Sequence, residues 1–395
     1  MRNPIVLLVT LLSLFTMTVG PGCGSSVDTD DDGTASGAGA NGPGVGGAGG
    51  ASATGGTGGV ISPCPSIAPD LQAVLEGAVE PTAPGGFVIG VASPTCPGWH
   101  GSQPGIHEVP KDGLYKMGTL SELLVAATIM KLVEDGELSL ADTLDSWQPG
   151  VPNASSITLR MLLNHSAGLA NHFTSPDFSS TLQADPQHVF TPQELVGFAT
   201  GLPATTPGGP YASEFIHTVL LGLVIEQVTS QAAHVAIRQR IIEPLGLTSV
   251  GLGGVEVDTA DLVPGYSGLG AELTNVLHPS AWWVSASYVS TVPDMVALVR
   301  GVLGTDEVLS AASREAMTDM AIPTGFPLFH SGLGVLIDNE ASPDIVGQEG
   351  ALPGYELRAY YAEAIDAGIV IMSTNQDAKT RAPLLQVLSA LNQPL

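Results

Sequence analysis

Apolar residues divide the chain into a segment without periodicity and a longer region of strand and helix patterns. From residue 25 to about residue 61, glycine and alanine dominate, and large apolar side chains are nearly absent. Such a segment buries too little surface to offset its ordering entropy. From about residue 65 onward, apolar runs alternate with Gly- and Pro-containing breaks. We therefore expect a flexible tether at residues 23–62 and one folded unit at residues 63–395.

Strand patterns stand near both ends of this folded unit. The run GGFVIGVAS at residues 85–93 is β-branched and is bounded by glycine and proline, which predicts a buried strand. Apolar and polar residues alternate with a period of two over residues 355–375, which predicts two strands joined by a turn near residues 366–368. A terminal helix is predicted to follow from about residue 380 to residue 391.

Helical patterns fill the space between the strands. Residues 119–134 and 213–230 are apolar around most of the helical circumference, so both helices should be buried. Further helices are predicted at residues 232–243, where Pro244 stops the pattern, and at residues 290–304. Strands at both ends with helices between them predict an α/β (α+β) fold, in which both termini supply the sheet and an α-helical half is inserted.

The N-terminus resembles a targeting segment. Arg2 precedes an apolar run at residues 5–19, which is too short for a comfortable membrane span. Gly22-Cys23 resembles the end of a bacterial lipobox, although Gly20 and Pro21 depart from it. We expect a signal segment at residues 1–22, lipidation of Cys23 and a place in the cell envelope, with the lipid as the sole membrane contact. Plain secretion is the alternative.

Charge narrows the range of partners. The chain holds 38 acidic and 12 basic residues, a formal net charge of −26. Nucleic acid and anionic lipid would both be repelled by such a surface. The nine histidines form no H-E-x-x-H motif and the cysteines lack metal-ligand spacing, so we expect no metal and no cofactor. In an oxidising compartment, Cys64 and Cys96 are candidates for a disulfide.

Several motifs in a fixed order carry a resemblance to a known family. They are LVEDGELSLADTL (residues 132–144), ITLRMLLNHSAGL (157–169), IIEPLGLTSVGL (241–252), VPGYSG (263–268), VSTVPDMVALVRGVL (289–303) and GIVIMSTNQD (368–377). Together they resemble the serine β-lactamase and penicillin-binding-protein-like family, which includes class C β-lactamases, D,D-peptidases and esterases. The resemblance implies a β-lactamase/transpeptidase-like antiparallel sheet flanked by helices.

The same resemblance places the family's catalytic positions in this chain. The serine nucleophile falls on Thr119 and the lysine one helical turn later falls on Glu122. The proton-relaying tyrosine falls on Tyr211 and its asparagine on Ser213. The Lys/His-x-Gly strand that binds substrate falls on Gln348-Glu349-Gly350. Tyr211 and Gly350 therefore keep the family's residues, and the other positions do not.

The change from lysine to Glu122 has the largest chemical consequence. A lysine stabilises a neighbouring alkoxide, whereas a carboxylate opposes it. Two anions roughly 4 Å apart at an effective dielectric near 20 repel by about 4 kcal/mol. A repulsion of this size corresponds to roughly a thousandfold in rate. Threonine retains a hydroxyl, but its methyl group stiffens the side chain and crowds attack.

A structural role for these residues competes with the catalytic one. Thr119-Leu-Ser-Glu122 matches a capping box, in which Glu122 would reach back to the amide of Thr119. His165 and His172 are candidate bases, although hydrogen-bonded framework histidines are the commoner case. Trp282 and Trp283 are either core residues or part of a cleft.

These observations predict a catalytically degenerate envelope protein that acts in binding or as a scaffold. We expect the old cleft to be lined by Thr119, Glu122, Tyr211, Ser213 and Gln348. With carboxylates at Glu122 and Glu349, it would suit a neutral or cationic ligand. Candidate partners are a peptidoglycan-derived peptide, a small molecule or an envelope protein. The alternative is a working hydrolase with Thr119 as the nucleophile and Tyr211 or Glu122 as the base.

Overall fold

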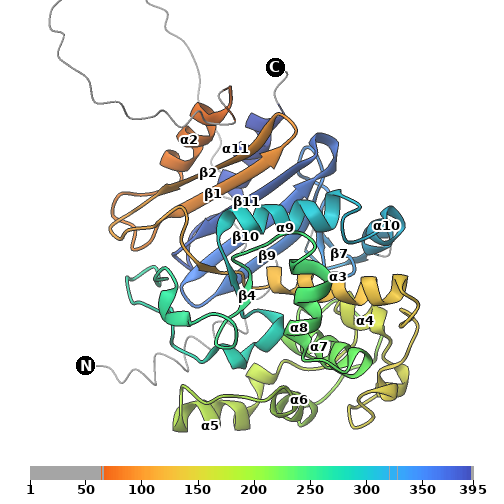
Figure 1. Ribbon diagram of the computed structural model, residues 1–395. Coiled ribbons are helices and arrows are strands. Elements are labelled where there is room, and N and C mark those ends of the chain that lie inside the picture. Colours follow the sequence, from red (N-terminus) through yellow and green to blue (C-terminus); the bar gives the residue numbers. More distant parts are fainter. Residues whose placement is uncertain (1–63, 65, 320, 327, 393–395) are drawn as a thin grey trace, which may run out of the picture.

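A computed structural model of the chain describes residues 64, 66–319, 321–326 and 328–392 (Figure 1). Its main element is an antiparallel sheet of eight strands in the order β2-β1-β11-β10-β9-β8-β7-β6. A small sheet in the order β3-β5-β4 lies beside it. The expected signal segment, the candidate lipidation site Cys23 and the tether at residues 23–62 lie outside the described residues.

Strands from the two ends of the folded region meet at the centre of the large sheet, as the sequence patterns predict. Strand β1 (Phe87–Ser93) pairs with β11 (Ala367–Ser373), which pairs with β10 (Tyr355–Ala362). Ile89 lies opposite Ile371, so β-branched side chains are neighbours across this central pair. The sheet is therefore closed by both ends of the chain.

The remaining strands extend this sheet or form the small one. On one side of the centre lies β2 (Cys96–Gln103), and on the other lie β9 (Ile345–Leu352), β8 (Leu336–Asp338), β7 (Phe329–Ser331) and β6 (Ile322–Pro323). The small sheet consists of β3 (Tyr115–Lys116), β5 (Tyr288–Ser290) and β4 (Gly251–Leu252). Because β3 ends at Lys116, two residues before Gly118, the small sheet sets the direction from which the chain enters its first long helix.

Helices cover both faces of the large sheet. Helices α2 (Ala68–Gly77) and α11 (Arg381–Leu391) pack on one face, over a core that contains Leu71, Ile89 and Leu388. On the other face lie α9 (Val292–Gly304) and the helical half (Figure 1). A larger core joins the helical half to that face of the sheet. The central strands β1, β10 and β11 are thus buried on both sides, whereas the edge strands β2 and β6 are partly exposed.

The helical half is built around two largely buried helices, α3 (Leu120–Glu134) and α7 (Phe215–Thr229). Shorter helices surround them: α4 (Leu159–Leu163), α5 (Pro176–Ala184), α6 (Pro192–Thr200), α8 (Ala233–Ile237) and α10 (Ala311–Asp319). The helix predicted at residues 232–243 does not continue as an α-helix, because a π-helical turn over Arg238–Ile242 follows α8. Within the described residues, no single helix meets the length and hydropathy of a membrane span, although α7 and residues 233–242 pass that test as a pair bent by 79°.

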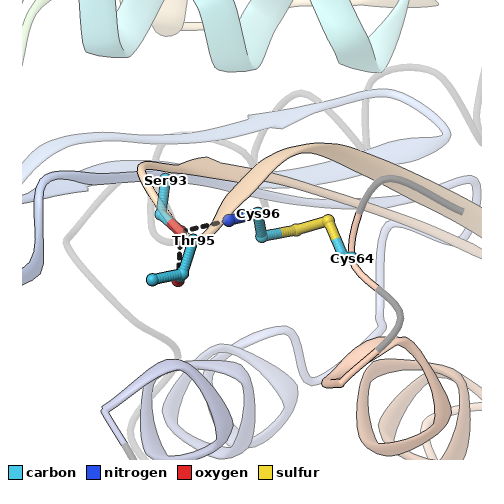
Figure 2. Close-up of a disulfide and its surroundings, with 4 residues drawn as sticks. All are labelled: Cys64, Ser93, Thr95 and Cys96. Atoms are coloured by element: carbon cyan, nitrogen blue, oxygen red, sulfur yellow. Dashed lines mark hydrogen bonds between the residues drawn. A yellow bond between two sulfur atoms is a disulfide. The ribbon is translucent and has the colours of Figure 1, made fainter. Parts of the chain in front are cut away.

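A disulfide ties the first described residue to the edge of the sheet (Figure 2). Cys64 is bonded to Cys96, the first residue of β2, and their Cα atoms are 4.7 Å apart. The amide of Cys96 donates to the hydroxyl of Ser93 at 3.1 Å, which fixes the turn between β1 and β2. Both cysteines are buried, so the bond also forms part of the core beneath α2.

We expect this disulfide to contribute substantially to stability, because it closes a loop with a sequence separation of 32 residues. In the chain-entropy model, a loop of this size contributes roughly 3–4 kcal/mol. The double variant Cys64→Ser, Cys96→Ser should lose that amount in urea unfolding, and adding a reductant should change the unaltered protein but not the variant. Equal stability of the oxidised protein and the double variant would contradict this expectation.

Candidate functional site

The site is organised by the close approach of two backbone segments. One is the start of α3, and the other is the part of β9 that runs past it. Gly118 has a φ of +54°, in the left-handed region that suits glycine. A Cβ atom added to Gly118 would lie 3.3 Å from the Cα atom of Gly350. A Cβ atom on Gly350 would lie 3.1 Å from the amide nitrogen of Thr119. Glycine at both positions lets β9 lie directly against the start of α3.

Thr119 is held by this strand. Its hydroxyl donates a hydrogen bond to the backbone carbonyl of Glu349, across 230 residues of sequence. The Thr119 side chain makes no capping hydrogen bond to α3. The capping-box prediction is therefore wrong, and the tertiary contact with β9 takes the hydroxyl instead.

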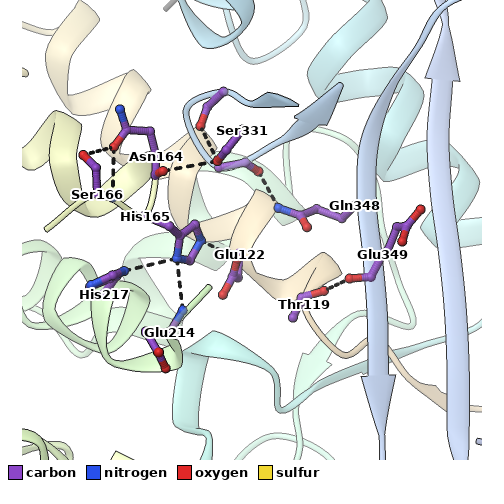
Figure 3. A network of polar contacts seen from close by, with 12 residues as sticks. Thr119, Glu122, Asn164, His165, Ser166, Glu214, His217, Ser331, Gln348 and Glu349 are labelled. Atoms are coloured by element: carbon purple, nitrogen blue, oxygen red, sulfur yellow. Dashed lines mark hydrogen bonds and ion pairs between the residues drawn. The ribbon is translucent and has the colours of Figure 1, made fainter. Parts of the chain in front are cut away.

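Glu122 turns away from the amide of Thr119 and faces a histidine (Figure 3). Its Oε2 atom lies 3.2 Å from Nε2 of His165, in the loop after α4. Thr119, Glu122 and His165 expose only 6%, 4% and 5% of their surface. The position expected to hold a catalytic cation therefore holds a buried carboxylate that has its own partner.

The ring of His165 is fixed from both sides. The backbone amide of Glu214 donates to Nδ1 of His165 at 3.4 Å, which makes this nitrogen an acceptor. Nε2 is then the protonated nitrogen, and its N–H donates a hydrogen bond to Oε2 of Glu122. Nδ1 of the buried His217, on α7, lies 3.2 Å from the same His165 nitrogen. Burial depresses the pKa of His217, and His165 adds to this effect, so His217 stays neutral.

Tyr211, Ser213 and Glu214 form a partly exposed rim beside this buried group. The Tyr211 ring stands edge-on to His165, with the ring centroids 5.7 Å apart. Burial raises the pKa of Tyr211 above its ordinary value, and the carboxylates of Glu122 and Glu214 act in the same direction, against a hydrogen bond with Ser213. Tyr211 therefore remains a protonated phenol at neutral pH and is a poor proton acceptor.

Strand β9 presents its residues to opposite faces of the sheet. Gln348 faces the site and is buried, and its amide nitrogen donates to the carbonyl of Gly334 at 2.9 Å. The side chain of Glu349 points away from Thr119 (Figure 3), pairs with Arg358 and accepts from the Tyr360 hydroxyl at 2.8 Å. The expectation that Glu349 adds a carboxylate to the cleft is wrong, since neighbouring strand residues alternate between faces.

Three groups could activate the Thr119 hydroxyl: a base within hydrogen-bond distance, a nearby lysine or a metal ion. Within the described residues, that hydroxyl makes one hydrogen bond, to a carbonyl that cannot accept its proton. Lys116 is three residues away in sequence, but its amine donates to the carbonyl of Thr274. No group of three or more His, Cys, Asp or Glu side chains in the described part of the chain is placed to hold a metal ion.

Two members of the site, His217 and Glu214, were not identified from the sequence. Both belong to the run SEFIHTV, which reads as the start of a buried apolar helix. His217 could have been identified as a site candidate, because a polar residue in a buried apolar helix needs a hydrogen-bond partner. His165 was recognised as a candidate framework histidine, and its contact with Glu122 could not be read from residues 43 positions apart.

Comparison with known proteins places the chain among related sequences. The Beta-lactamase family model matches residues 90–391. A putative penicillin-binding protein, PbpX of Bacillus subtilis (strain 168), is 21% identical over 287 residues, which cover 71% of this chain and 67% of that protein. A lovastatin esterase of Penicillium rubens is 27% identical over 164 residues, which cover 35% of this chain and 39% of the esterase.

Solved structures share the same architecture. The D-amino acid amidase from Ochrobactrum anthropi SV3, complexed with D-phenylalanine, superposes with a TM-score of 0.74 at 22% identity and covers 82% of this chain and 99% of its own. A D-stereospecific amidohydrolase from Streptomyces sp. superposes with a TM-score of 0.72 at 24% identity. The match covers 81% of this chain and 97% of the amidohydrolase. At these identities the likeness establishes the shared fold, an antiparallel sheet of terminal strands with a helical insertion, in agreement with the sequence prediction.

We expect Glu122→Ala to destabilise the protein, because it leaves the buried Nε2 proton of His165 without an acceptor. Loss of one partner from such a pair should lower the free energy of unfolding by roughly 2–3 kcal/mol. Glu137→Ala, at an exposed position just beyond α3, is the matched control and should change it by less than about 0.5 kcal/mol. Urea unfolding measures both variants, and similar values for the two would argue against the buried pair.

Glu214 should make stability depend on pH. Burial raises its pKa to about 7 from an ordinary value of 4.5, partly offset by His165 and by a hydrogen bond from Asn171. The folded protein therefore holds this proton more firmly than the unfolded chain. The resulting stabilisation is complete below about pH 4.5 and is lost as the pH rises through about 7.

The variant Glu214→Gln should remove this contribution, because glutamine does not titrate. Between pH 4.5 and pH 7.5, the unaltered protein should lose roughly 2–3 kcal/mol of unfolding free energy relative to the variant, after an allowance for residual solvent contact. Urea unfolding at several pH values measures this difference, with the exposed Glu137→Gln as a control. Parallel pH profiles for Glu214→Gln and the unaltered protein would show that Glu214 titrates normally.

Proposed function

The chain belongs to the beta-lactamase family of serine hydrolases, and from that premise we propose that it is a catalytically degenerate member. Its site no longer forms an acyl-enzyme and serves in binding or as a scaffold. One observation carries the proposal: the Thr119 hydroxyl is bonded to a strand carbonyl, while Glu122, in place of a lysine, is bonded to His165. The hydroxyl thus has neither a base to take its proton nor a cation to stabilise the alkoxide.

Electrostatics support the same conclusion. Attack by Thr119 would create an anion one helical turn from a buried carboxylate, and Glu214 adds a second carboxyl group at the rim. Two unit charges about 4 Å apart repel by about 4 kcal/mol at an effective dielectric near 20. Tyr211 does not serve as the base, because its raised pKa keeps the phenol protonated. Glu122, Glu214 and Tyr211 therefore all disfavour the same step, the formation of a nucleophilic alkoxide.

The nature of the site favours a neutral or cationic ligand over an anionic one. With Glu349 on the opposite face, Glu122 and Glu214 are the carboxyl groups of the site, and Ser213 and Tyr211 supply hydroxyls at its partly exposed rim. Relatives of this fold include a penicillin-binding protein and an amidase complexed with a D-amino acid. A peptidoglycan-derived peptide with a free amino group suits both observations, and an envelope protein is the other candidate.

The location is part of the proposal. The lipobox-like Cys23 and the tether at residues 23–62 would place the folded unit at the cell envelope, anchored by lipid and facing away from the membrane. A Gly/Ala-rich connection of this length gives a folded unit reach without fixing its orientation. Labelling with a radioactive fatty acid, compared with Cys23→Ser, distinguishes lipidation from plain secretion.

Intact-mass spectrometry tests the loss of catalysis. The purified protein is treated separately with a reactive penicillin and with an activated ester, alongside Thr119→Ala. We expect no adduct that depends on Thr119 with either reagent, because the hydroxyl lacks a base. An active serine hydrolase of the same family serves as the positive control for each reagent, and circular dichroism confirms that the protein is folded. A stoichiometric adduct that disappears in Thr119→Ala would establish the alternative, a working hydrolase with a threonine nucleophile.

A further inference from the structure

Strand β2 forms one edge of the large sheet and offers unpaired backbone groups. It pairs with β1 on one side and has no neighbouring strand on the other (Figure 1). Among the described residues, residues 97–103 form no backbone hydrogen bond outside this pairing. The sequence CPGWHGSQ of β2 holds no Lys, Arg, Asp or Glu, the charges that commonly protect an edge from further pairing. Pro97 lacks an amide N–H, so the segment that can pair begins at Gly98.

A cavity of about 300 Å³ lies beside this edge, between β2 and α9. The four consecutive residues from Pro97 to His100 line it. Because neighbouring residues of a strand point to opposite faces, four in a row line one cavity only where it reaches the strand's backbone. A Cβ atom added to Gly98 would meet no heavy atom within 4 Å, so open space borders this residue. The cavity is therefore continuous with the free edge of β2.

The first half of α9 supplies an apolar wall of this cavity. Pro293, Val296 and Ala297 line it from this helix, and Leu245 adds to them. The volume lies at the lower end of the range of ligand pockets and suits one large side chain. Apolar walls favour an aliphatic or aromatic side chain, because its burial removes apolar surface from water.

The polar part of the lining favours a positive charge. Nε and Nη2 of Arg300 donate to Asp366 at 3.1 and 2.6 Å, so this guanidinium is already paired. The carboxylate of Glu307, which also lines the cavity, forms no hydrogen bond or ion pair among the described residues. Glu307 is exposed, so its side chain can turn toward a bound cation. An anionic ligand would instead have to compete with Asp366 for Arg300.

We propose that β2 binds an extended, basic segment of a partner protein as an added strand, with one large apolar side chain in the cavity and a Lys or Arg beside Glu307. In this mode of recognition, main-chain hydrogen bonds to the free edge supply affinity and the cavity supplies specificity. A second copy of this chain is a poor occupant, because each copy carries a formal net charge of −26. None of the residues involved belongs to the site around Thr119, so this binding does not depend on the loss of catalysis.

Isothermal titration calorimetry with two acetylated and amidated peptides, Thr-Phe-Thr-Lys-Thr and its reverse Thr-Lys-Thr-Phe-Thr, tests the proposal. Residues two apart in a strand share a face, so Phe can enter the cavity while Lys faces Glu307, and the two orders cover both strand directions. We expect one of them to bind with a dissociation constant of roughly 0.1–1 mM, because a short flexible peptide loses conformational freedom on binding. Replacing its Lys by Glu should weaken binding by about tenfold.

Variants of the protein test the cavity and the charge separately. Ala297→Trp, at an exposed position on α9, fills the cavity and should abolish binding, and Gly98→Leu should do the same from β2. Glu307→Gln should weaken binding by about threefold, which is typical of one exposed ion pair. Glu315→Gln is the matched control, because it removes an exposed carboxylate that does not line the cavity, and it should bind like the unaltered protein.

Methylation of alternate backbone amides of the peptide distinguishes strand addition from burial of the phenyl ring alone. An added strand turns only every second amide toward β2, so one methylation pattern should abolish binding and the other should spare it. Equal effects of the two patterns, unchanged binding in Ala297→Trp and Gly98→Leu, or no binding of either peptide at millimolar concentration would overturn the proposal. A dimer of the unaltered protein in light scattering that Gly98→Leu dissociates would assign the edge to a second copy, and would overturn it as well.

Discussion

The site depends on the contact of β9 with the first turn of α3. Gly118 and Gly350 bring the two backbones together, and this approach places the carbonyl of Glu349 over the hydroxyl of Thr119. Strand β9 is held in turn from its opposite face, where Glu349 pairs with Arg358 and Tyr360. In the proposed degenerate site, this hydrogen bond to a fixed carbonyl keeps the buried hydroxyl from a base. The packing of β9 against α3 therefore also engages the hydroxyl of Thr119, the residue at the position of the family's nucleophile, in a hydrogen bond.

The charges in the helical half follow from this arrangement. A lysine at position 122 would place an ammonium group beside Thr119, whereas Glu122 places a carboxylate there and needs a donor of its own. His165 supplies that donor because the amide of Glu214 fixes its other ring nitrogen as an acceptor. His217 lies against the same ring and remains neutral through burial. The result is a buried polar cluster in which Glu122 and His165 satisfy each other, while Nε2 of His217 and one carboxyl oxygen of Glu214 have no hydrogen-bond partner among the described residues.

Much of the fold was accessible from the sequence, because it rests on local periodicity. The predicted strand at residues 85–93 corresponds to β1, the predicted pair at residues 355–375 corresponds to β10 and β11, and the helix predicted from Thr119 begins at Leu120. The candidate site was less accessible. The capping box at Thr119 satisfies every local rule and fails because distant partners, Glu349 and His165, compete for both side chains. The direction of Glu349 follows from the alternation of β9, whose register could not be fixed from its sequence.

The proposed loss of catalysis depends on whether the hydroxyl of Thr119 takes part in any reaction. The most direct measurement is the steady-state hydrolysis of p-nitrophenyl acetate by the unaltered protein and by Thr119→Val, which replaces the hydroxyl with a methyl group of the same shape. We expect the same slow rate for both proteins, since a degenerate site would not activate the hydroxyl. A rate that falls at least tenfold in Thr119→Val, with the fold intact, would show that Thr119 is a working nucleophile and would contradict the account.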